Sequence, residues 1–167
     1  RLFMDRLEQA VAGRDADAAP LALVYLDVDR MNNVNDSLGH AAGDALLRAI
    51  GERLTQTVRR DDTVARLEGD EFAVMIGGVR DTRDAARIVD ELAGALRRPT
   101  PVHGHELFAT VSIGVALYPQ DAASVDELVR NADTALNLAK RDGDGFAFFT
   151  ADMNARVAEY LTLETRL

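Results

Sequence analysis

Residues 21–26 read Leu-Ala-Leu-Val-Tyr-Leu, and acidic side chains follow at Asp27 and Asp29. A continuous apolar run of this length is typical of a central β-strand that is covered on both faces. The run is the longest of its kind in the chain, and it is far too short to cross a bilayer. The sequence therefore predicts a buried strand whose end presents carboxylates.

The overall charge of the chain is strongly negative. Its 167 residues, 47% of them apolar, are typical of one soluble domain. With 19 Lys and Arg residues against 28 Asp and Glu residues, the formal net charge is −9, and Lys140 is the only lysine. We therefore expect no nucleic-acid partner, because binding to a phosphate backbone requires a basic face. We also expect no signal peptide and no membrane contact by this domain, since the chain opens with an amphipathic, charged segment.

The residue types available restrict any metal site. The chain has no cysteine, which excludes disulfides and thiolate ligands. A metal is then held by oxygen atoms or by a cluster of His40, His103 and His105. Oxygen ligands are favoured, because His103 and His105 are distant in sequence from the carboxylate-rich segment.

The pattern of apolar residues around this strand predicts an α/β fold. Apolar residues at helical spacing alternate with strand-like runs, and Glu68-Gly69-Asp70 has the composition of a hairpin turn. Ser124 with Glu127 predicts a capping box at a helix start, and Gly143 its end. The order fits a palm-like split βαβ arrangement, a central mixed or antiparallel sheet flanked by helices. The expected elements are helices over 1–13, 46–58, 81–97, 124–142 and 153–167, a polar segment over 30–37, a hairpin over 63–76, and strands over 108–115 and 146–149.

Two acidic clusters stand at the ends of predicted strands: Asp27 with Asp29, and Asp70 with Glu71. If the strands are neighbours, the carboxylates converge, and Mg²⁺ between them would offset their repulsion. Acids at strand ends and turns are more often simply solvated. Adjacent strand residues face opposite sides, so that Asp70 and Glu71 should have different roles.

Several segments resemble one protein family. Residues 67–72, Leu-Glu-Gly-Asp-Glu-Phe, resemble the signature loop of the GGDEF family of bacterial diguanylate cyclases, with Glu68 in place of the first glycine. Residues 26–40 with Gly43-Asp44 are similar to the first strand and nucleotide loop of the family. Residues 112–116 and 132–140 are similar to its later motifs, in order and spacing. The resemblance implies a GGDEF domain over residues 1–152 and a C-terminal helix or linker over 153–167.

The resemblance implies a reaction and its catalytic residues. Family members condense two GTP into cyclic di-GMP, each domain of a homodimer presenting one GTP to the other. By this resemblance, Asp27 and Asp70 bind Mg²⁺ (or Mn²⁺) with the carbonyl of Val28, and Glu71 assists attack by the 3′-hydroxyl. Carboxylates can perform both tasks, since phosphoryl displacement needs metal ions and a proton acceptor.

The resemblance also implies how the substrate is bound. Asn35 and Asp44 match the guanine-binding positions, and their amide and carboxylate groups complement the guanine edge. His40 lies in the same motif, lining the ribose or the loop. Gly69 lets the hairpin backbone approach the phosphates, and Lys140 lies near them. The alternative for Asn35, Asp36 and Asp44 is capping of the following helix.

Arg59 and Asp62 form an Arg-x-x-Asp pattern just before the hairpin motif. The pattern stands where many family members carry the inhibitory product site for cyclic di-GMP. An Arg fork can bind guanine edges and phosphates, and a carboxylate can accept from guanine. The alternative is an ordinary surface salt bridge.

Departures from the family pattern predict weak turnover. Glu68 replaces a glycine, Met31-Asn32 replaces Phe-Lys, and Asp144 replaces an arginine, so that the phosphate site loses positive and gains negative charge. The alternative is a catalytically inactive, GTP- or cyclic di-GMP-binding regulatory module; a pure dimerisation module is a third possibility. Residues 149–156 resemble the linker into EAL phosphodiesterase domains, which implies an attached EAL domain in a cytoplasmic part of a larger protein.

Overall fold

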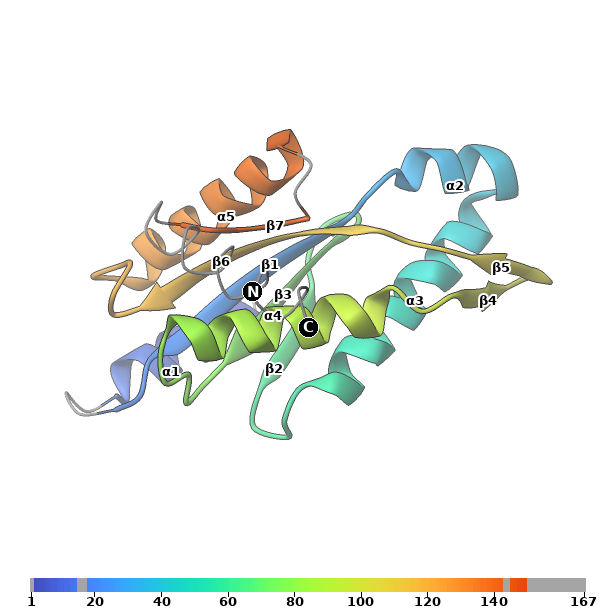
Figure 1. Ribbon diagram of the computed structural model, residues 1–167. Helices are drawn as coiled ribbons and strands as arrows, with labels where there is room; N and C mark the ends of the chain where they lie inside the picture. The colour runs from blue at the N-terminus through green and yellow to red at the C-terminus, as the bar shows by residue number, and fades with distance from the viewer. Residues whose placement is uncertain (1, 15–17, 143–144, 150–167) are drawn as a thin grey trace, which may run out of the picture.

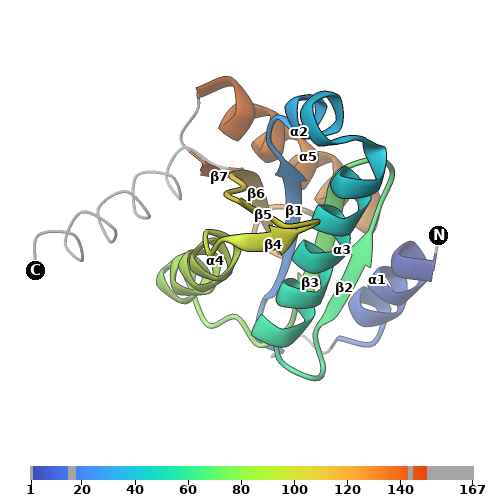
Figure 2. The ribbon, with the colours of Figure 1, turned by 90° about the vertical axis from the view of Figure 1, so that its right-hand side faces the viewer.

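The computed structural model describes residues 2–14, 18–142 and 145–149, and in this part the main sheet has the strand order β2-β3-β1-β6-β7. Neighbouring strands run antiparallel except β6 and β7, which are parallel (Figures 1 and 2). The mixed sheet with flanking helices confirms the predicted fold class. The elements are α1 (Leu2–Ala12), β1 (Leu21–Val28), α2 (Met31–Leu38), α3 (His40–Thr57), β2 (Thr63–Arg66), β3 (Glu71–Ile76), α4 (Thr82–Leu96), β4 (Thr100–Val102), β5 (His105–Leu107), β6 (Val111–Tyr118), α5 (Val125–Asp142) and β7 (Phe146–Phe148).

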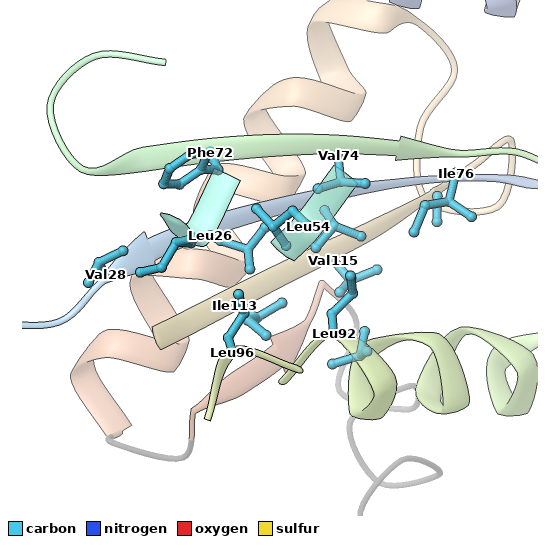
Figure 3. Packing of buried hydrophobic residues seen from close by; sticks show 14 of the residues in the cluster. Leu26, Val28, Leu54, Phe72, Val74, Ile76, Leu92, Leu96, Ile113 and Val115 are labelled. Atoms are coloured by element: carbon cyan, nitrogen blue, oxygen red, sulfur yellow. The ribbon is translucent and has the colours of Figure 1, made fainter. Parts of the chain in front are cut away.

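The central strand β1 is buried along its whole length, which explains its continuous apolar run. Successive side chains point to opposite faces of the sheet. One set packs against α3 and α4, where Leu26 meets residues such as Leu54 and Phe72 (Figure 3). The other set, which includes Tyr25, packs against α1 and α5. Two apolar layers therefore hold β1 rigidly and fix the position of its acidic end.

The segment after β1 is helical, and our expectation of a polar segment over 30–37 was wrong in this respect. Residues 31–38 form α2, in which Met31 is the buried side chain. Arg30 before it (φ 58°) and Gly39 after it (φ 92°) have positive φ angles, and these bends separate α2 from β1 and from α3. A helix forms among these polar residues because Val34 and Leu38, at helical spacing from Met31, also pack against the core.

A small hairpin, β4–β5, lies outside the main sheet and extends from it (Figure 1). We did not predict this hairpin. The strand expected from Phe108 begins only at Val111, and the Phe108 side chain is 72% exposed. Alternation continues across 108–110, but in the described part of the chain these residues have no register partner in the main sheet, and only Thr110 is bonded to the segment after β1, through the Asp29 amide.

Helix α5 packs unusually close to the sheet. A Cβ atom at Gly114 of β6 would lie 2.2 Å from the amide nitrogen of Leu136 and 2.6 Å from the carbonyl oxygen of Ala132. Glycine is therefore required at this position. The predicted cap is present, since the amide of Glu127 donates to the Ser124 hydroxyl at 3.2 Å, while the Glu127 carboxylate accepts from the amide of Ala123. This docking directs the last turn of α5, with Lys140, toward the end of β1.

Among the described residues, no helix combines the length and the apolar character that a bilayer crossing requires. Three sequence-based expectations lie outside the described residues: the end of α5 at Gly143, the substitution at Asp144 and the helix over 153–167.

Candidate functional site

The two acidic clusters meet at one end of the sheet. Asp27 is paired with Glu71 across the antiparallel β1 and β3 strands. The amide of Val28 donates a hydrogen bond to the carbonyl of Asp70 at 3.1 Å. Asp70 itself belongs to the turn rather than to β3, so that strand alternation does not carry it away from Asp27. The carboxylates therefore converge as the neighbouring-strand argument requires.

Asp27 is the most buried of these carboxylates, with 7% of its surface exposed. Its Oδ2 is ion-paired with the Lys140 ammonium, whereas its Oδ1 is buried and has no partner among the described residues. The pKa of Asp27 is raised to about 6: burial is the largest cause, the Asp70 carboxylate also raises it, and Lys140 opposes both effects. The two carboxyl groups can share a hydrogen bond when one is protonated. A buried oxygen without a donor is a position that a cation can fill.

These residues fit a cation that is shared with a phosphate ligand. Among the described residues, no three acidic or histidine side chains are arranged to hold a metal by themselves. Mg²⁺ is usually bound by one or two carboxylates together with waters and substrate phosphates, rather than by a cage of protein ligands. Asp27 and Asp70 supply two carboxylates, and the unpartnered Oδ1 of Asp27 is available as a ligand. His103 and His105 lie on the β4–β5 hairpin, outside the main sheet that carries Asp27.

Asp29 has a different environment from Asp27. Its Oδ1 accepts a hydrogen bond from the Ser112 hydroxyl at 2.8 Å, and its Oδ2 accepts from the Thr110 hydroxyl at 2.9 Å. Its amide donates to the carbonyl of Thr110 at 2.9 Å. These bonds attach the end of β1 to β6, while Val28 attaches it to the hairpin. Asp29 is therefore a positioning residue, which sequence reasoning had placed with Asp27 without a separate role.

The predicted guanine-binding residues come from two adjoining helices. A Cβ atom at Gly43 would lie 2.0 Å from the Asn35 side-chain oxygen, so the Asn35 side chain lies against α3 one residue from the exposed Asp44. His40 begins α3 and is exposed. The alternative capping role is wrong, since Arg30 and Gly39 occupy the N-cap positions of α2 and α3 and neither helix has a side-chain cap.

The turn between β2 and β3 bears on phosphate binding. Gly69 is exposed and has a φ angle of 63°, a conformation that glycine adopts without strain. The Arg66 guanidinium lies 3.3–3.4 Å from the carbonyl of Gly69. Glu68 is exposed in the same turn, and Asn32 is exposed on α2. The turn thus offers backbone for close approach, with the negative charge of Glu68 beside it.

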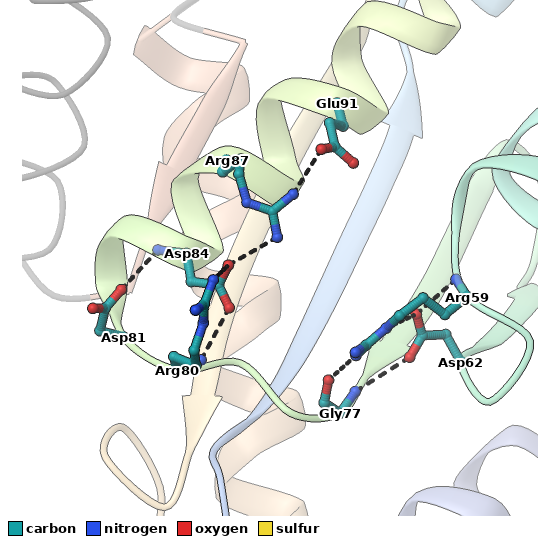
Figure 4. Close-up of polar contacts among 8 residues, drawn as sticks. All are labelled: Arg59, Asp62, Gly77, Arg80, Asp81, Asp84, Arg87 and Glu91. Carbon is teal, nitrogen blue, oxygen red and sulfur yellow. Dashed lines mark hydrogen bonds and ion pairs between the residues drawn. The ribbon is translucent and has the colours of Figure 1, made fainter.

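Arg59 and Asp62 form the salt bridge that the alternative interpretation predicted, at 3.5 Å between Nε and Oδ2. Asp62 also accepts hydrogen bonds from the amides of Arg59 (3.0 Å) and Gly77 (3.3 Å), and Arg59 donates to the carbonyl of Gly77 (Figure 4). The Asp62 side chain is 4% exposed and that of Arg59 is 63% exposed. The carboxylate is thus fixed, while most of the guanidinium side chain stays accessible.

The same pair lines a cavity of about 130 Å³ between this turn and α4. Arg87 of α4 lines the other side, held by Asp84 at 2.8 Å and Glu91 at 2.7 Å (Figure 4). Sequence reasoning missed Arg87, because helical spacing marked its neighbours as core and gave no reason to connect it with Arg59. The salt bridge and a binding site are therefore compatible.

Comparisons with known proteins agree on one family. The family described as "Diguanylate cyclase, GGDEF domain" matches residues 1–145. The bifunctional diguanylate cyclase/cyclic di-GMP phosphodiesterase MucR of Pseudomonas aeruginosa is 42% identical over 163 residues, which are 97% of this chain and 24% of MucR. The chain thus spans about a quarter of that relative.

Solved structures show the same architecture. The GGDEF domain of TpbB (YfiN) from Pseudomonas aeruginosa is 38% identical, with a TM-score of 0.81 over 84% of this chain and 88% of that one. The GGDEF domain of DgcB from Caulobacter crescentus, solved in complex with c-di-GMP, is 25% identical, with a TM-score of 0.79 over 88% of both chains. The fold, the acidic site at the end of β1 and these matches together show that the chain belongs to the GGDEF domain family of cyclic di-GMP signalling.

Proposed function

We propose that this domain binds GTP together with Mg²⁺ or Mn²⁺ at the end of β1 and converts it to cyclic di-GMP weakly. Diguanylate cyclases of this family are generally metal-dependent. The observation that carries the proposal is the buried Asp27 carboxylate, which lies beside Asp70 and Glu71 and has one oxygen without a partner in the described part of the chain. Since GTP is a cytosolic nucleotide, we assign the domain to the cytoplasm.

The proposed roles follow from the position of each group. Asp27 and Asp70 hold the cation with the carbonyl of Val28, and the bound ion neutralises charge on the phosphate oxygens. Glu71, across the strand pair from Asp27, receives the proton of the attacking 3′-hydroxyl. Lys140 balances phosphate charge. A homodimer is needed for condensation, because each domain presents a single GTP.

The remaining substrate contacts belong to the helices and the turn. Asn35 and Asp44 bind the guanine edge, with the amide as donor and the carboxylate as acceptor. His40 lines the ribose side, and the positive φ angle of Gly69 allows the hairpin backbone to approach the phosphates.

Weak turnover follows from the charges near the phosphates. Glu68 is an exposed carboxylate in the hairpin turn, and Asn32 is an exposed, uncharged side chain on α2. Asp144 adds a further negative charge in the sequence. Each lost charge-assisted contact is worth about 1.5–3 kcal/mol, so that GTP affinity falls by orders of magnitude.

A second function is favoured by the cavity beside Arg59. Here the accessible Arg59, the fixed Asp62 and Arg87 surround about 130 Å³. We propose that cyclic di-GMP binds at this cavity, with one part of the ligand against Arg59, as an inhibitory or regulatory site; DgcB, a structural relative, has been solved with c-di-GMP. In a longer protein the domain would then control an attached EAL phosphodiesterase domain, in line with the bifunctional character of MucR.

Calorimetric titration with GTP and with cyclic di-GMP, beside a turnover assay in Mg²⁺ or Mn²⁺, tests these functions. We expect GTP binding that requires the metal and is reduced at least tenfold in Asp27→Ala, with slow product formation. The control is Asp61→Ala, which removes an exposed loop carboxylate away from the site. GTP affinity that is equal in wild type and Asp27→Ala would show that the assignment is wrong. Binding of cyclic di-GMP without turnover would favour the regulatory function.

A further inference from the structure

Lys140 occupies the acidic site as a resident cation. Its ammonium is ion-paired with Oδ2 of Asp27, and the Lys140 side chain is 38% exposed. Burial lowers the pKa of Lys140, but the Asp27 hydrogen bond and the charges of Asp27, Glu71 and Asp70 outweigh this and raise it. All three site carboxylates thus act on one ammonium group, which stays charged.

The backbone holds Lys140 in this place. Helix α5 contacts β6 at Gly114 without room for a Cβ atom, so the helix backbone lies directly against the sheet. Lys140 lies in the last turn of α5, and its flexible side chain reaches Asp27 from there. Rotation of this side chain is enough to take the ammonium away from Asp27.

The ammonium and a divalent ion compete for the same carboxylate. A metal ligated by Oδ1 of Asp27 lies on the same carboxylate whose Oδ2 is paired with Lys140, and the two cations repel each other at this distance. Without a nucleotide, the nearby anions left to a displaced Lys140 are Asp70 and Glu71, whose negative charge the metal also neutralises. A nucleotide changes this balance, because its phosphates give the ammonium a new partner close to Asp27.

We propose that Lys140 competes with the divalent cation for Asp27, an inference that rests on the proposed GTP site. Lys140 blocks metal binding until a nucleotide binds, and metal and nucleotide therefore bind cooperatively. The coupling is reciprocal, since the factor by which nucleotide raises metal affinity equals the factor by which metal raises nucleotide affinity. A nucleotide-free domain then stays metal-free, and its acidic site remains closed by the ion pair.

The test measures Mn²⁺ affinity by electron paramagnetic resonance, with and without a non-hydrolysable GTP analogue. Lys140→Met removes the charge and keeps most of the side-chain length. Loss of Lys140 raises the pKa of Asp27 above its value of about 6. The measurement is therefore made at pH 8.5, which keeps the carboxylate ionised. The matched control is Arg130→Met, which removes a positive charge from the same helix, ten residues or about 15 Å along its axis away.

We expect Lys140→Met to bind Mn²⁺ alone at least tenfold more tightly than wild type, and to reduce the factor by which the GTP analogue raises Mn²⁺ affinity. Lys140→Arg, which keeps the charge, should stay near wild type, as should Arg130→Met. A structural role for Lys140 would weaken binding in every condition. The tightening of metal binding is therefore specific to competition.

The inference is overturned if Lys140→Met leaves the affinity for Mn²⁺ alone unchanged or weakens it. If wild type binds Mn²⁺ and the GTP analogue together while Lys140→Met shows no tightening, the proposed function stands and the competition fails. If Lys140→Met binds Mn²⁺ tightly but no variant binds the GTP analogue, the competition stands and the GTP site fails. Thermal unfolding of each variant establishes that the compared proteins are folded.

Discussion

The main-chain amide of Val28 donates a hydrogen bond to the carbonyl of Asp70 across 3.1 Å, joining the end of the central strand to the hairpin turn. This bond continues the β1–β3 register that pairs Asp27 with Glu71. On the opposite side, Asp29 ties the same end of β1 to Thr110 and Ser112. The acidic residues are therefore held by the backbone on two sides, and their mutual repulsion does not separate them.

Burial of Asp27 has a consequence for stability. Its folded-state pKa of about 6 exceeds the ordinary value of 3.8, so its contribution to folding is present below about pH 4 and is lost as the pH rises through 6. Asp27→Asn removes this dependence. The free energy of unfolding of Asp27→Asn minus that of wild type should therefore be about 1–3 kcal/mol larger at pH 7.5 than at pH 4.

Urea unfolding at both pH values checks this, with Asp61→Asn as a control for the loss of one exposed carboxylate. The control should show a much smaller change between the two pH values. A difference between Asp27→Asn and wild type that does not vary with pH would contradict the buried-charge argument.

Base selection should depend on Asp44. Adenine leaves the donors and acceptors of the proposed guanine site unpaired, which disfavours ATP by several kcal/mol. Asp44→Ala should weaken GTP binding and bring the two nucleotides close to equal affinity. Because Asp44 is exposed and caps no helix, the variant should keep its thermal stability. Competition binding with GTP and ATP measures the effect, and undiminished preference for GTP in Asp44→Ala would argue against the assignment.

Cyclic di-GMP binding should depend on both sides of the cavity beside α4. Arg59→Ala and Arg87→Ala should each weaken it at least tenfold, because each removes a charged fork from the lining. GTP affinity should stay nearly unchanged, since these residues lie away from Asp27. The control is Arg60→Ala, an exposed neighbour that does not line the cavity. Parallel loss of GTP and cyclic di-GMP binding would instead indicate a disturbed fold.

Restoring charge around the phosphates should restore activity. The triple variant Glu68→Gly, Asn32→Lys, Asp144→Arg removes two negative charges and adds two positive ones. It should raise GTP affinity and turnover together, because Asp27, Asp70 and Glu71 are unchanged.

Calorimetry and product formation measure both effects. A wild-type domain that already turns over GTP as fast as the triple variant would refute the charge argument. Tight GTP binding by an inert triple variant would locate the defect in dimer formation.

The sequence by itself determined the fold class, the central strand and the two acidic clusters. The reason is local: a continuous apolar run specifies a strand buried on both faces, and turn residues such as Gly69 act within a few positions. The resemblance to the family motifs identified the individual candidate site residues within these clusters. The short helix α2 and the β4–β5 hairpin escaped prediction, because eight helical residues and three paired residues are too short for a clear periodic pattern.

Only the tertiary structure decided which groups share an environment. Asp27 and Asp29 are alike in sequence, yet one is buried beside Lys140 and the other is bound by Ser112 and Thr110. Likewise, Arg59 and Arg87 are 28 positions apart and meet at one cavity only through the packing of α4. Register and helix docking bring together residues far apart in the chain, and such long-range contacts leave no local signal in the sequence.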